Sequence, residues 1–410
     1  NLAPADLPKE GGRFDLPIAL GILVASGQVP GERALESEFL GELAMDGSLQ
    51  PVPGAVCAAL SASACGRSLV LPPACADKAA RVPDCTDLGA PDLLTLCAHL
   101  NGTEPISPAD IPVAQETGNY PDLKDVTGQE AARRALEVAA SGGHNLLFTG
   151  PPGTGKTMLA SRLPGILPPM NREEALVSLA LRDFDSSANN IEYLHRPFRN
   201  PHHSASAAAL IGGGSRPRPG EASLAHGGVL FLDELPEFNR HCLEVLREPL
   251  ESGQVTLSRA NSKLSYPASF QLVAAMNPCP CGYRGDPNRG CRCSPDQVQR
   301  YSGRISGPLL DRIDIFATVP RLPAASLLSE GGDAEPSSEV RARVTRCRER
   351  QQQRQHCCNA RLDSRRLHRA CELGAGQRQV LEQAATRMHL SGRALHRVMR
   401  VARTIADMDA

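Results

Sequence analysis

Residues 144–160 read HNLLFTGPPGTGKTMLA, and this stretch is the strongest indication of the fold. A short apolar strand is expected over 145–149, followed by the glycine-rich loop Gly150–Thr157 and then a helix. Glycines let the backbone turn its N–H groups toward phosphate oxygens, and the start of the helix adds the positive end of its dipole. Strand, loop and helix in this order are the context that a P-loop requires. The stretch therefore predicts an α/β core that binds a nucleoside triphosphate.

Within the loop, Lys156 is placed to reach the β- and γ-phosphates, and Thr157 offers a hydroxyl to Mg²⁺. A chance glycine-rich turn is the alternative, but it does not explain the full pattern in this setting. The residues that we expect to bind ATP are Gly150, Pro151, Pro152, Gly153, Thr154, Gly155, Lys156 and Thr157.

A second motif, GGVLFLDEL at 227–235, follows some 80 residues after the loop. Its four apolar residues, Val229–Leu232, predict a strand buried on both faces, as a parallel sheet requires. Asp233 at the end of this strand is expected to hold Mg²⁺, and Glu234 to polarise the attacking water. An apolar strand ending in Asp–Glu is weak evidence alone and strong evidence after a P-loop.

Two further polar residues follow predicted elements. Asn277 ends the apolar strand expected in FQLVAAMNP, at 270–278. It either orients the water beside the γ-phosphate or caps a turn before Pro278. Arg312 lies in GPLLDRIDIF, between a helix end and a strand. In a ring it could reach a neighbour's γ-phosphate; otherwise it is a surface arginine paired with Asp311 or Asp314.

The stretch 279–293 reads CPCGYRGDPNRGCRC and holds two close cysteine pairs. Two such pairs across a Gly/Pro-rich loop can surround one tetrahedral Zn²⁺, although CxC is tighter than the usual CxxC spacing. Disulfides are the alternative and are disfavoured in a reducing cytosol. The expected zinc ligands are Cys279, Cys281, Cys291 and Cys293.

Residues 196–228 form a polar, glycine-rich stretch between the P-loop and the Asp–Glu strand. Its composition predicts a mobile insertion with basic tips, outside the core. His202 and His203 are adjacent in sequence, so their side chains are expected to point apart and not to share one metal ion.

The bulk composition is that of a globular protein: 410 residues, 41% hydrophobic, 22% charged, with a net charge of −1. The segment 341–410 is the exception, with 16 Arg, no Lys and 6 acidic residues. It either meets phosphates or is a solvated helical face. No stretch approaches the roughly 18 apolar residues of a membrane span. Scattered cysteines indicate a reduced, cytoplasmic protein.

The length of the chain and its linker stretches rich in Pro, Gly and Ser predict three domains. Residues 1–112 form an α+β unit with a hairpin at Asp46–Gly47, residues 113–322 carry the nucleotide motifs, and residues 336–410 form an arginine-rich helical lid. Helices are expected over 376–390 and 391–408. The first and last domains are expected to be incomplete at the two ends of the chain.

Together, GPPGTGKT, RPFRNPHHSAS, GGVLFLDEL, AAMNPCPCG, RISGPLLDRID and SGRALHRVMRVARTIAD resemble the blocks of one family, in the same order. This family is the magnesium-chelatase-like AAA+ proteins of the YifB/ComM type. The resemblance covers essentially the whole chain and implies a P-loop AAA+ core with a parallel sheet and a helical lid.

The resemblance also implies roles for single residues. Asn277 would be sensor 1, Arg312 the arginine finger and Arg393 the sensor 2 residue of the lid. The hairpin at 254–267 would face the pore of a ring, with Arg259 and Lys263 as DNA-phosphate contacts. ComM-type members are hexameric DNA motors that promote branch migration during natural transformation. The implied partners are therefore single-stranded or branched DNA and further copies of the chain.

The N-terminal part is similar to the proteolytic domain of Lon, which has a ribosomal S5 domain 2-like fold. Where Lon carries its serine this chain has Asp15, and where Lon carries its lysine it has Val56. Neither residue can take over the role, so no peptidase activity is expected.

Two other functions compete with the DNA motor. One is the ATPase subunit of a true magnesium chelatase, which the Lon-like domain and the cysteine cluster disfavour. The other is an ATP-gated protease or protein-remodelling adaptor, which would require casein hydrolysis dependent on Asp15.

Overall fold

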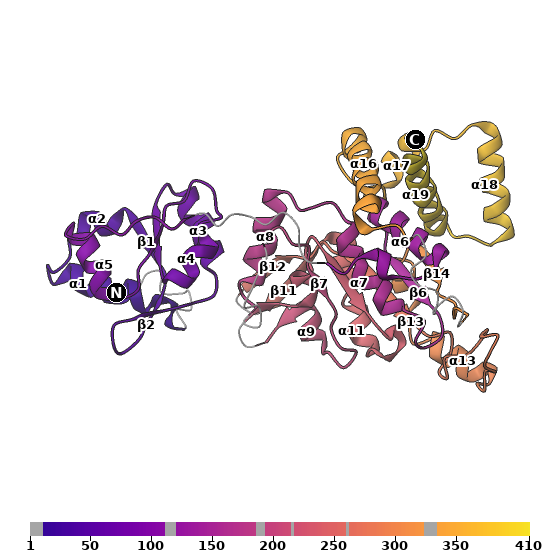
Figure 1. Ribbon diagram of the computed structural model, residues 1–410, viewed down its shortest axis with the longest axis horizontal. Coiled ribbons are helices and arrows are strands. Elements are labelled where there is room, and N and C mark those ends of the chain that lie inside the picture. The colour runs from indigo at the N-terminus through magenta and orange to yellow at the C-terminus, as the bar shows by residue number, and fades with distance from the viewer. Residues whose placement is uncertain (1–10, 111–119, 186–192, 215–216, 260–261, 324–333) are drawn as a thin grey trace. The chain divides into compact units, whose positions relative to one another are not determined.

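The computed structural model describes residues 11–110, 120–185, 193–214, 217–259, 262–323 and 334–410. The chain divides into two compact units (Figure 1). The first takes residues 1–116 and 171–194, and the second takes 117–170 and 195–410. The three-domain boundaries expected from the sequence stay a prediction, but segment 171–194 groups with the N-terminal residues.

The first unit has a three-stranded parallel sheet in the order β1-β4-β5 and a separate hairpin, β2–β3. The hairpin predicted at Asp46–Gly47 is confirmed, because β2 and β3 pair antiparallel on either side of it. In its turn the Asp46 carboxylate accepts a hydrogen bond from the Ser48 N–H at 3.0 Å. The elements are η1 (Gly12–Phe14), α1 (Asp15–Ala25), α2 (Gly31–Leu35), β1 (Ser37–Phe39), β2 (Glu42–Leu43), β3 (Leu49–Gln50), α3 (Ala55–Ala64), β4 (Ser68–Leu71), α4 (Pro73–Ala79), β5 (Asp87–Gly89), α5 (Leu93–Asn101) and α8 (Arg172–Arg182).

Helix α8 belongs to this unit because its apolar side chains complete one of the unit's two cores. Leu176 and Leu179 are buried in the same cluster as Leu69 of β4. The Asp183 carboxylate, just after the helix, accepts hydrogen bonds from the Gly54 N–H at 2.9 Å and from Lys78 at 3.2 Å.

The second unit is built on a five-stranded parallel sheet in the order β14-β6-β13-β10-β7. Numbered along the chain, this order is 5-1-4-3-2, so the chain leaves β6 on one side and returns to it on the other. The predicted α/β fold with a parallel sheet is confirmed. In an open sheet of this kind, ligands bind outside the carboxyl ends of the strands, where the order reverses.

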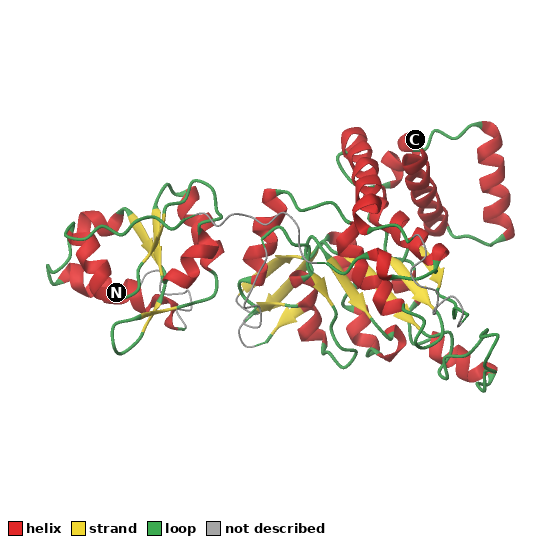
Figure 2. Cartoon of the chain, viewed as in Figure 1, coloured by secondary structure: helices red, strands yellow, loops and turns green. Residues whose placement is uncertain are grey.

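The core elements of the second unit are η2 (Leu123–Asp125), α6 (Glu130–Gly142), β6 (Leu146–Thr149), α7 (Lys156–Ile166), β7 (Phe198–Arg199), α9 (Ala207–Ile211), β8 (Gly212–Gly213), β9 (Arg218–Pro219), α10 (Glu221–Leu224), β10 (Val229–Leu232), η3 (Leu235–Glu237), α11 (Arg240–Glu244), α12 (Arg247–Ser252), β11 (Gln254–Arg259), β12 (Ser262–Pro267), β13 (Gln271–Met276), α13 (Pro295–Ser302), α14 (Gly307–Leu310) and β14 (Ile315–Thr318). Helices cover both faces of the sheet (Figure 2). Helices α6 and α7 pack on one face, and α9, α10 and α11 pack on the other.

The expectation that residues 196–228 lie outside the core was wrong. Strand β7 within this stretch pairs with β10 and forms one edge of the central sheet. Leu210 and Ala222 are fully buried in the core beneath the sheet. Arg196 is buried as well, and its guanidinium donates to the carbonyls of Pro168, Pro169 and Gly227. Polar composition misled here because the polar groups find partners in the backbone.

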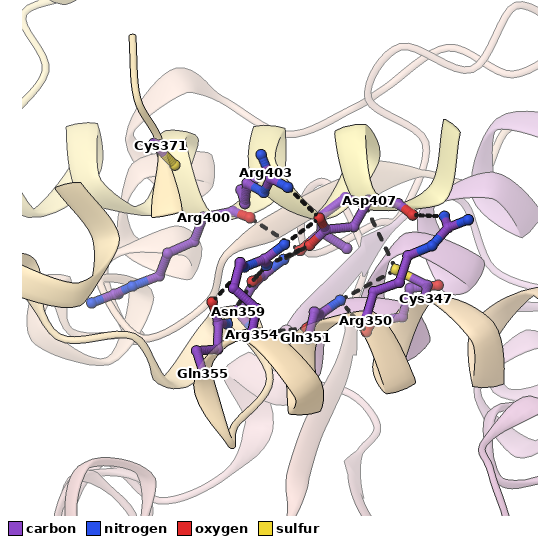
Figure 3. A network of polar contacts seen from close by, with 12 residues as sticks. Cys347, Arg350, Gln351, Arg354, Gln355, Asn359, Cys371, Arg400, Arg403 and Asp407 are labelled. Atoms are coloured by element: carbon purple, nitrogen blue, oxygen red, sulfur yellow. Dashed lines mark hydrogen bonds and ion pairs between the residues drawn. The ribbon is translucent and has the colours of Figure 1, made fainter. Parts of the chain in front are cut away.

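The lid consists of α16 (Ser337–Gln355), η4 (Asn359–Arg361), α17 (Ser364–Ala370), α18 (Ala375–Arg387) and α19 (Gly392–Asp409). The helices expected over 376–390 and 391–408 are thus confirmed as α18 and α19. Figure 3 shows the polar network that joins α16 to α19. At its centre Asp407, which is 1% exposed, accepts hydrogen bonds from Arg354, Asn359 and Arg403.

Candidate active site

The glycine-rich loop follows β6 and has the conformation that its sequence predicts. Gly153 and Gly155 have φ values of 73° and 89°, which residues with a side chain rarely adopt. A Cβ on Gly150 would lie 2.1 Å from the carbonyl oxygen of Val319. Helix α7 begins at Lys156, so its free N–H groups face the loop. The loop therefore presents backbone N–H groups at a helix start, which is the arrangement that binds phosphate.

Lys156 lies inside this loop and is only 9% exposed. Its ammonium donates to the carbonyls of Gly150 at 2.8 Å and Pro151 at 2.9 Å, and to the side-chain oxygen of Asn277 at 3.1 Å. Burial lowers the pKa of this ammonium, although the nearby carboxylates partly offset the effect. A buried cation of this kind gains from an anionic partner, so the site suits a phosphate.

Thr157, the next residue, meets the end of β10. Its hydroxyl donates to Asp233 Oδ2 at 2.6 Å, and the other carboxylate oxygen of Asp233 accepts from the Glu234 N–H at 2.9 Å. A hydroxyl and a carboxylate are oxygen ligands of the kind that Mg²⁺ prefers. These two side chains would hold the ion beside the phosphates.

A cavity of about 420 Å³ connects these groups. It opens at the carboxyl edge of the sheet, where β6, β10 and β13 all end. The lining residues are Pro152, Gly153, Thr154, Gly155, Lys156, Thr157, Asp233, Glu234, Met276 and Asn277. Asn277 reaches the cavity through its contact with Lys156, and this placement favours the water-orienting alternative over a simple turn cap.

Glu234 has a partner that the sequence interpretation missed. The residue is in the left-handed region, with φ 51° and ψ 46°, and its side chain is 54% exposed. His203 Nδ1 lies 3.4 Å from Glu234 Oε2. The rings of His202 and His203 lie 4.0 Å apart, so the expectation that these side chains point apart was wrong. The clue available in the sequence was the position of His203 shortly after β7, whose end lies at the same edge of the sheet.

The four cysteines between β13 and α13 come together as their spacing predicts. The Sγ atom of Cys279 lies 3.4 Å from that of Cys281 and 3.6 Å from that of Cys291, and the latter two are 3.7 Å apart. All four Sγ atoms, including that of Cys293, lie within 4.8 Å of one another. Four thiolates at about 2.3 Å from one zinc ion would be about 3.8 Å apart, so the donor set fits Zn²⁺. Hydrogen bonds from the backbone N–H groups of Tyr283 and Arg292 lower the pKa of the Cys281 thiol to about 6.

The loop that carries the four cysteines, residues 279–293 (the cysteine loop), packs directly on the P-loop. Gly282, with φ 84°, lies so close to Pro152 that a Cβ there would be 2.6 Å from the proline ring. Arg321, shortly after β14, forms an ion pair of 3.1 Å with Asp286 of the same loop. The cysteine loop is therefore held between the nucleotide cavity and the end of β14.

Arg312 and Arg393 are not in the nucleotide cavity. Both line a second cavity, of about 650 Å³, together with Asn145 and Asp314, which precede β6 and β14. The second cavity therefore lies at the amino edge of the sheet, opposite the P-loop. Arg312 is paired with Glu251, not with a neighbouring aspartate, and its side chain is 10% exposed. Both arginines therefore lie at the edge of the sheet opposite the nucleotide cavity of their own chain.

Comparison with known proteins agrees with this geometry. Models of the magnesium chelatase subunit ChlI match residues 1–75 and 122–327, and a model of the C-terminal part of that subunit matches 334–410. The competence protein ComM of Haemophilus influenzae is 50% identical over 415 residues, which cover 100% of this chain and 81% of that protein. The uncharacterised protein YifB of Salmonella typhimurium is 49% identical over 418 residues, with the same coverage.

The chain belongs to the magnesium-chelatase-like AAA+ family of the YifB/ComM type. As a member of this ATPase family it has the P-loop core that its sequence predicts. Lon protease 2 of Bacillus subtilis is 27% identical over 181 residues, which cover 38% of the chain and 33% of that protein. In this family member Asp15 begins α1, and Val56 is fully buried in α3.

The hairpin β11–β12 of this YifB/ComM-type chain is six residues long on each side. Lys263 near its tip is exposed. The side chain of Arg259 lies outside the described residues. At the base of the hairpin the Tyr266 hydroxyl donates to the carbonyl of Pro217 at 3.2 Å, which joins it to the β8–β9 hairpin. Among the described residues, no helix has the length and apolar character to cross a membrane.

Proposed function

We propose that this protein is an ATP-hydrolysing motor that forms a hexameric ring and moves on DNA. Its role would be the promotion of branch migration during natural transformation or recombination, in the cytoplasm. The observation that carries the proposal is the division of the site between two edges of one sheet. Lys156, Thr157 and Asp233 lie at one edge, and Arg312 and Arg393 lie at the other.

At the carboxyl edge, the loop N–H groups and Lys156 would bind the phosphates of ATP. Mg²⁺ held by Thr157 and Asp233 would neutralise charge on the phosphate oxygens. Glu234 is the carboxylate best placed to accept a proton from the attacking water, since it borders the cavity and is partly exposed. Asn277 would orient that water, as sensor 1 does in the family that the sequence resembles.

At the amino edge, Arg312 would act as the arginine finger and Arg393 as sensor 2, both on the nucleotide of a neighbouring chain. A guanidinium supplied in this way stabilises charge on the transferring phosphoryl group. Because the two cavities face opposite edges, one copy can donate arginines while it receives those of the next copy. Head-to-tail contacts of this kind form a ring when the rotation from one copy to the next closes.

DNA is the proposed substrate along which the motor moves. Lys263 and Arg259 of the β11–β12 hairpin would contact DNA phosphates in the pore of the ring, and the name of the ComM relative supports this role. Binding through phosphates would weaken steeply as salt rises. The cysteine cluster is proposed to hold one structural Zn²⁺, which would brace the loop beside Pro152.

The alternative is the ATPase subunit of a magnesium chelatase that inserts Mg²⁺ into a porphyrin. The matches to models of subunit ChlI favour this candidate. Both candidates hydrolyse ATP, so turnover alone does not separate them. Binding of the other chelatase subunits, and of no DNA, would identify the alternative.

The test is ATP turnover of the intact protein with and without forked DNA at low salt. We expect forked DNA to raise turnover severalfold, and Lys263→Ala to reduce this stimulation without changing turnover in the absence of DNA. Ser258→Ala, on the same hairpin, is the matched control because it removes no charge. Failure to bind any nucleic acid at low salt would refute the DNA motor.

A further inference from the structure

Five polar residues of α19 form one continuous stripe. Arg393, Arg397, Arg400, Thr404 and Asp407 follow one another at steps of four and three residues. Residues with this spacing lie on one face of a helix. Arg393 lines the amino-edge cavity at the beginning of the stripe, and Asp407 sits in the buried network of Figure 3 at its end.

Arg397, in the stripe, binds the chain on both sides of Arg312. Its Nη1 donates to the carbonyl of Leu310 at 2.9 Å and to that of Ile313 at 2.6 Å. Its Nη2 donates to the Asp311 carboxylate at 3.3 Å. The last carbonyls of a helix have no partner within the helix, and α14 ends at Leu310. The Leu310 carbonyl also accepts from the Ile313 N–H at 3.1 Å, so the guanidinium of Arg397 adds a second bond to it and a bond to the Ile313 carbonyl beyond Arg312.

Two further residues, Asn145 and His144, tie the same segment to the sheet and the lid. The Asn145 amide donates to the carbonyl of Arg312 at 2.8 Å. His144, which is fully buried, lies 3.3 Å from the Asp314 carboxylate and 2.8 Å from the Thr404 hydroxyl of α19. The segment around Arg312 is thus held by Arg397 of α19 on one side and by Asn145 and His144 on the other. Thr404 of α19 in turn contacts His144.

The other end of α19 is fixed. Arg400 donates to the carbonyl of Leu362 at 2.9 and 2.6 Å, and Thr404 and Asp407 are bound to Asn359. Arg354 of α16 forms two hydrogen bonds of 2.7 Å with Asp407. Because the helix is anchored in the lid, Arg397 transmits the position of the lid to the backbone of Arg312.

We propose that Arg397 is a positioning residue that makes the lid and the arginine finger one rigid body. It would set Arg312 and, one helical turn away, Arg393 in the geometry that a neighbour's nucleotide requires. Arginine suits this position best, because its planar guanidinium serves two carbonyls and one carboxylate at once, whereas a lysine ammonium could keep only part of this set. The inference rests on the proposed action of Arg312 on a neighbouring chain.

The experiment uses mixtures of two full-length variants. One chain carries Lys156→Ala, which removes its own nucleotide site but leaves its finger. The other carries Arg312→Ala, which removes its finger but leaves its nucleotide site. Neither chain hydrolyses ATP alone, whereas the mixture recovers turnover at interfaces where the first chain donates to the second. This parent mixture is the reference.

Arg397→Met is then added to one chain at a time. In the finger-donating chain we expect the recovered turnover to fall about tenfold or more, since an arginine finger is worth about 10³–10⁵ in kcat. In the nucleotide-holding chain the same substitution should cost less than about twofold, because that chain has no finger to position. Arg397→Lys in the donating chain should recover part of the turnover.

Arg403→Met in the donating chain is the matched control. Arg403 is on the same helix, but its 2.7 Å bond goes to Asp407 within the lid, where Arg354 still holds the same carboxylate, so we expect a loss of less than about twofold. Equal losses from Arg397→Met in both chains would mean that Arg397 only stabilises the fold and would overturn the inference. No loss in the donating chain would overturn it too. No recovered turnover in the parent mixture would refute the action of Arg312 in trans, and the inference with it.

Discussion

Thr157 and Asp233 are 76 residues apart in sequence, and the hydroxyl of the first donates to the carboxylate of the second at 2.6 Å. One residue begins α7 and the other follows β10, so the contact joins the two motifs on which the nucleotide site depends. It also marks the place of the metal, because both oxygens are hard ligands.

Thr157→Ala should therefore weaken the binding of Mg²⁺ more than the binding of the nucleotide base. We expect the Mg²⁺ concentration that gives half-maximal ATP turnover to rise about tenfold or more, the lower range seen when support for a bound metal is lost. Thr157→Ser keeps the hydroxyl and is the control, with little change. An equal shift in both variants would show that the methyl group, not the hydroxyl, matters.

Removal of the Arg312 side chain should separate binding from hydrolysis. Arg312→Ala is expected to lower kcat on the order of 10³-fold while each chain still binds ATP, because the guanidinium acts only in the transition state. Turnover and nucleotide affinity measured on the same preparation check this. Normal turnover of Arg312→Ala would exclude the finger role.

In a chain without a neighbour, Glu251 forms an ion pair with Arg312 and would compete with the neighbour's nucleotide for its guanidinium. The Glu251 side chain is 62% exposed, so this ion pair is worth at most about 1 kcal/mol. Glu251→Gln should therefore raise kcat/KM for ATP by no more than about fivefold. A large loss of turnover in this variant would instead make Glu251 a required part of the site.

The cysteine cluster predicts about one zinc ion per chain. Cys281→Ser or Cys291→Ser should remove the metal and, because Gly282 packs on Pro152, raise the KM for ATP. Metal analysis beside ATP kinetics tests both effects. Cys357→Ser, outside the cluster, is the control and should keep both zinc and affinity. Metal-free protein from a preparation without chelators would contradict the assignment.

Asp407 makes the lid sensitive to acid. Burial would raise the pKa of its carboxyl, but hydrogen bonds from Arg354 and Asn359 and the charge of Arg403 outweigh burial and lower the pKa. A lowered folded-state pKa contributes stability above the unfolded value of about 3.9, and this contribution is lost as the pH falls through the folded-state pKa.

Asp407→Asn should cost about 3 kcal/mol of lid stability at pH 7, the usual cost of breaking a buried ion pair. The difference from the unchanged protein should shrink as the pH falls below about 4. Hydrogen exchange of the α16 and α19 amides measures both. Asp409→Asn is the control, since the Asp409 side chain is 68% exposed. A difference that persists unchanged at low pH would refute the role of the Asp407 charge.

The sequence was sufficient to predict features that depend only on a local pattern of residues. The glycine loop, the buried strand before Asp233 and the spacing of the four cysteines each depend on a few neighbouring residues, and the structure has them as expected. Amphipathic spacing likewise predicted α18 and α19. These features need no knowledge of what lies opposite them.

Long-range partners could not be predicted in this way. Nothing local says that Leu176 of α8 packs with Leu69, or that Glu251 is the partner of Arg312. The stretch around Arg196 was mistaken for an insertion because a polar sequence does not reveal which backbone carbonyls will receive its hydrogen bonds. The contact of His203 with Glu234 depends in the same way on how the edge of the sheet is assembled.

ATP binding and turnover of Glu234→Gln, with and without forked DNA, test the assignment of the nucleotide site. We expect this variant to retain bound ATP but to hydrolyse it at least about 100-fold more slowly, since it loses the general base. Glu237→Gln, three residues away and paired with Arg304, should turn over ATP normally. Turnover by Glu234→Gln at the rate of the unchanged protein, or failure of the unchanged protein to retain any nucleotide, would contradict the assignment of this site.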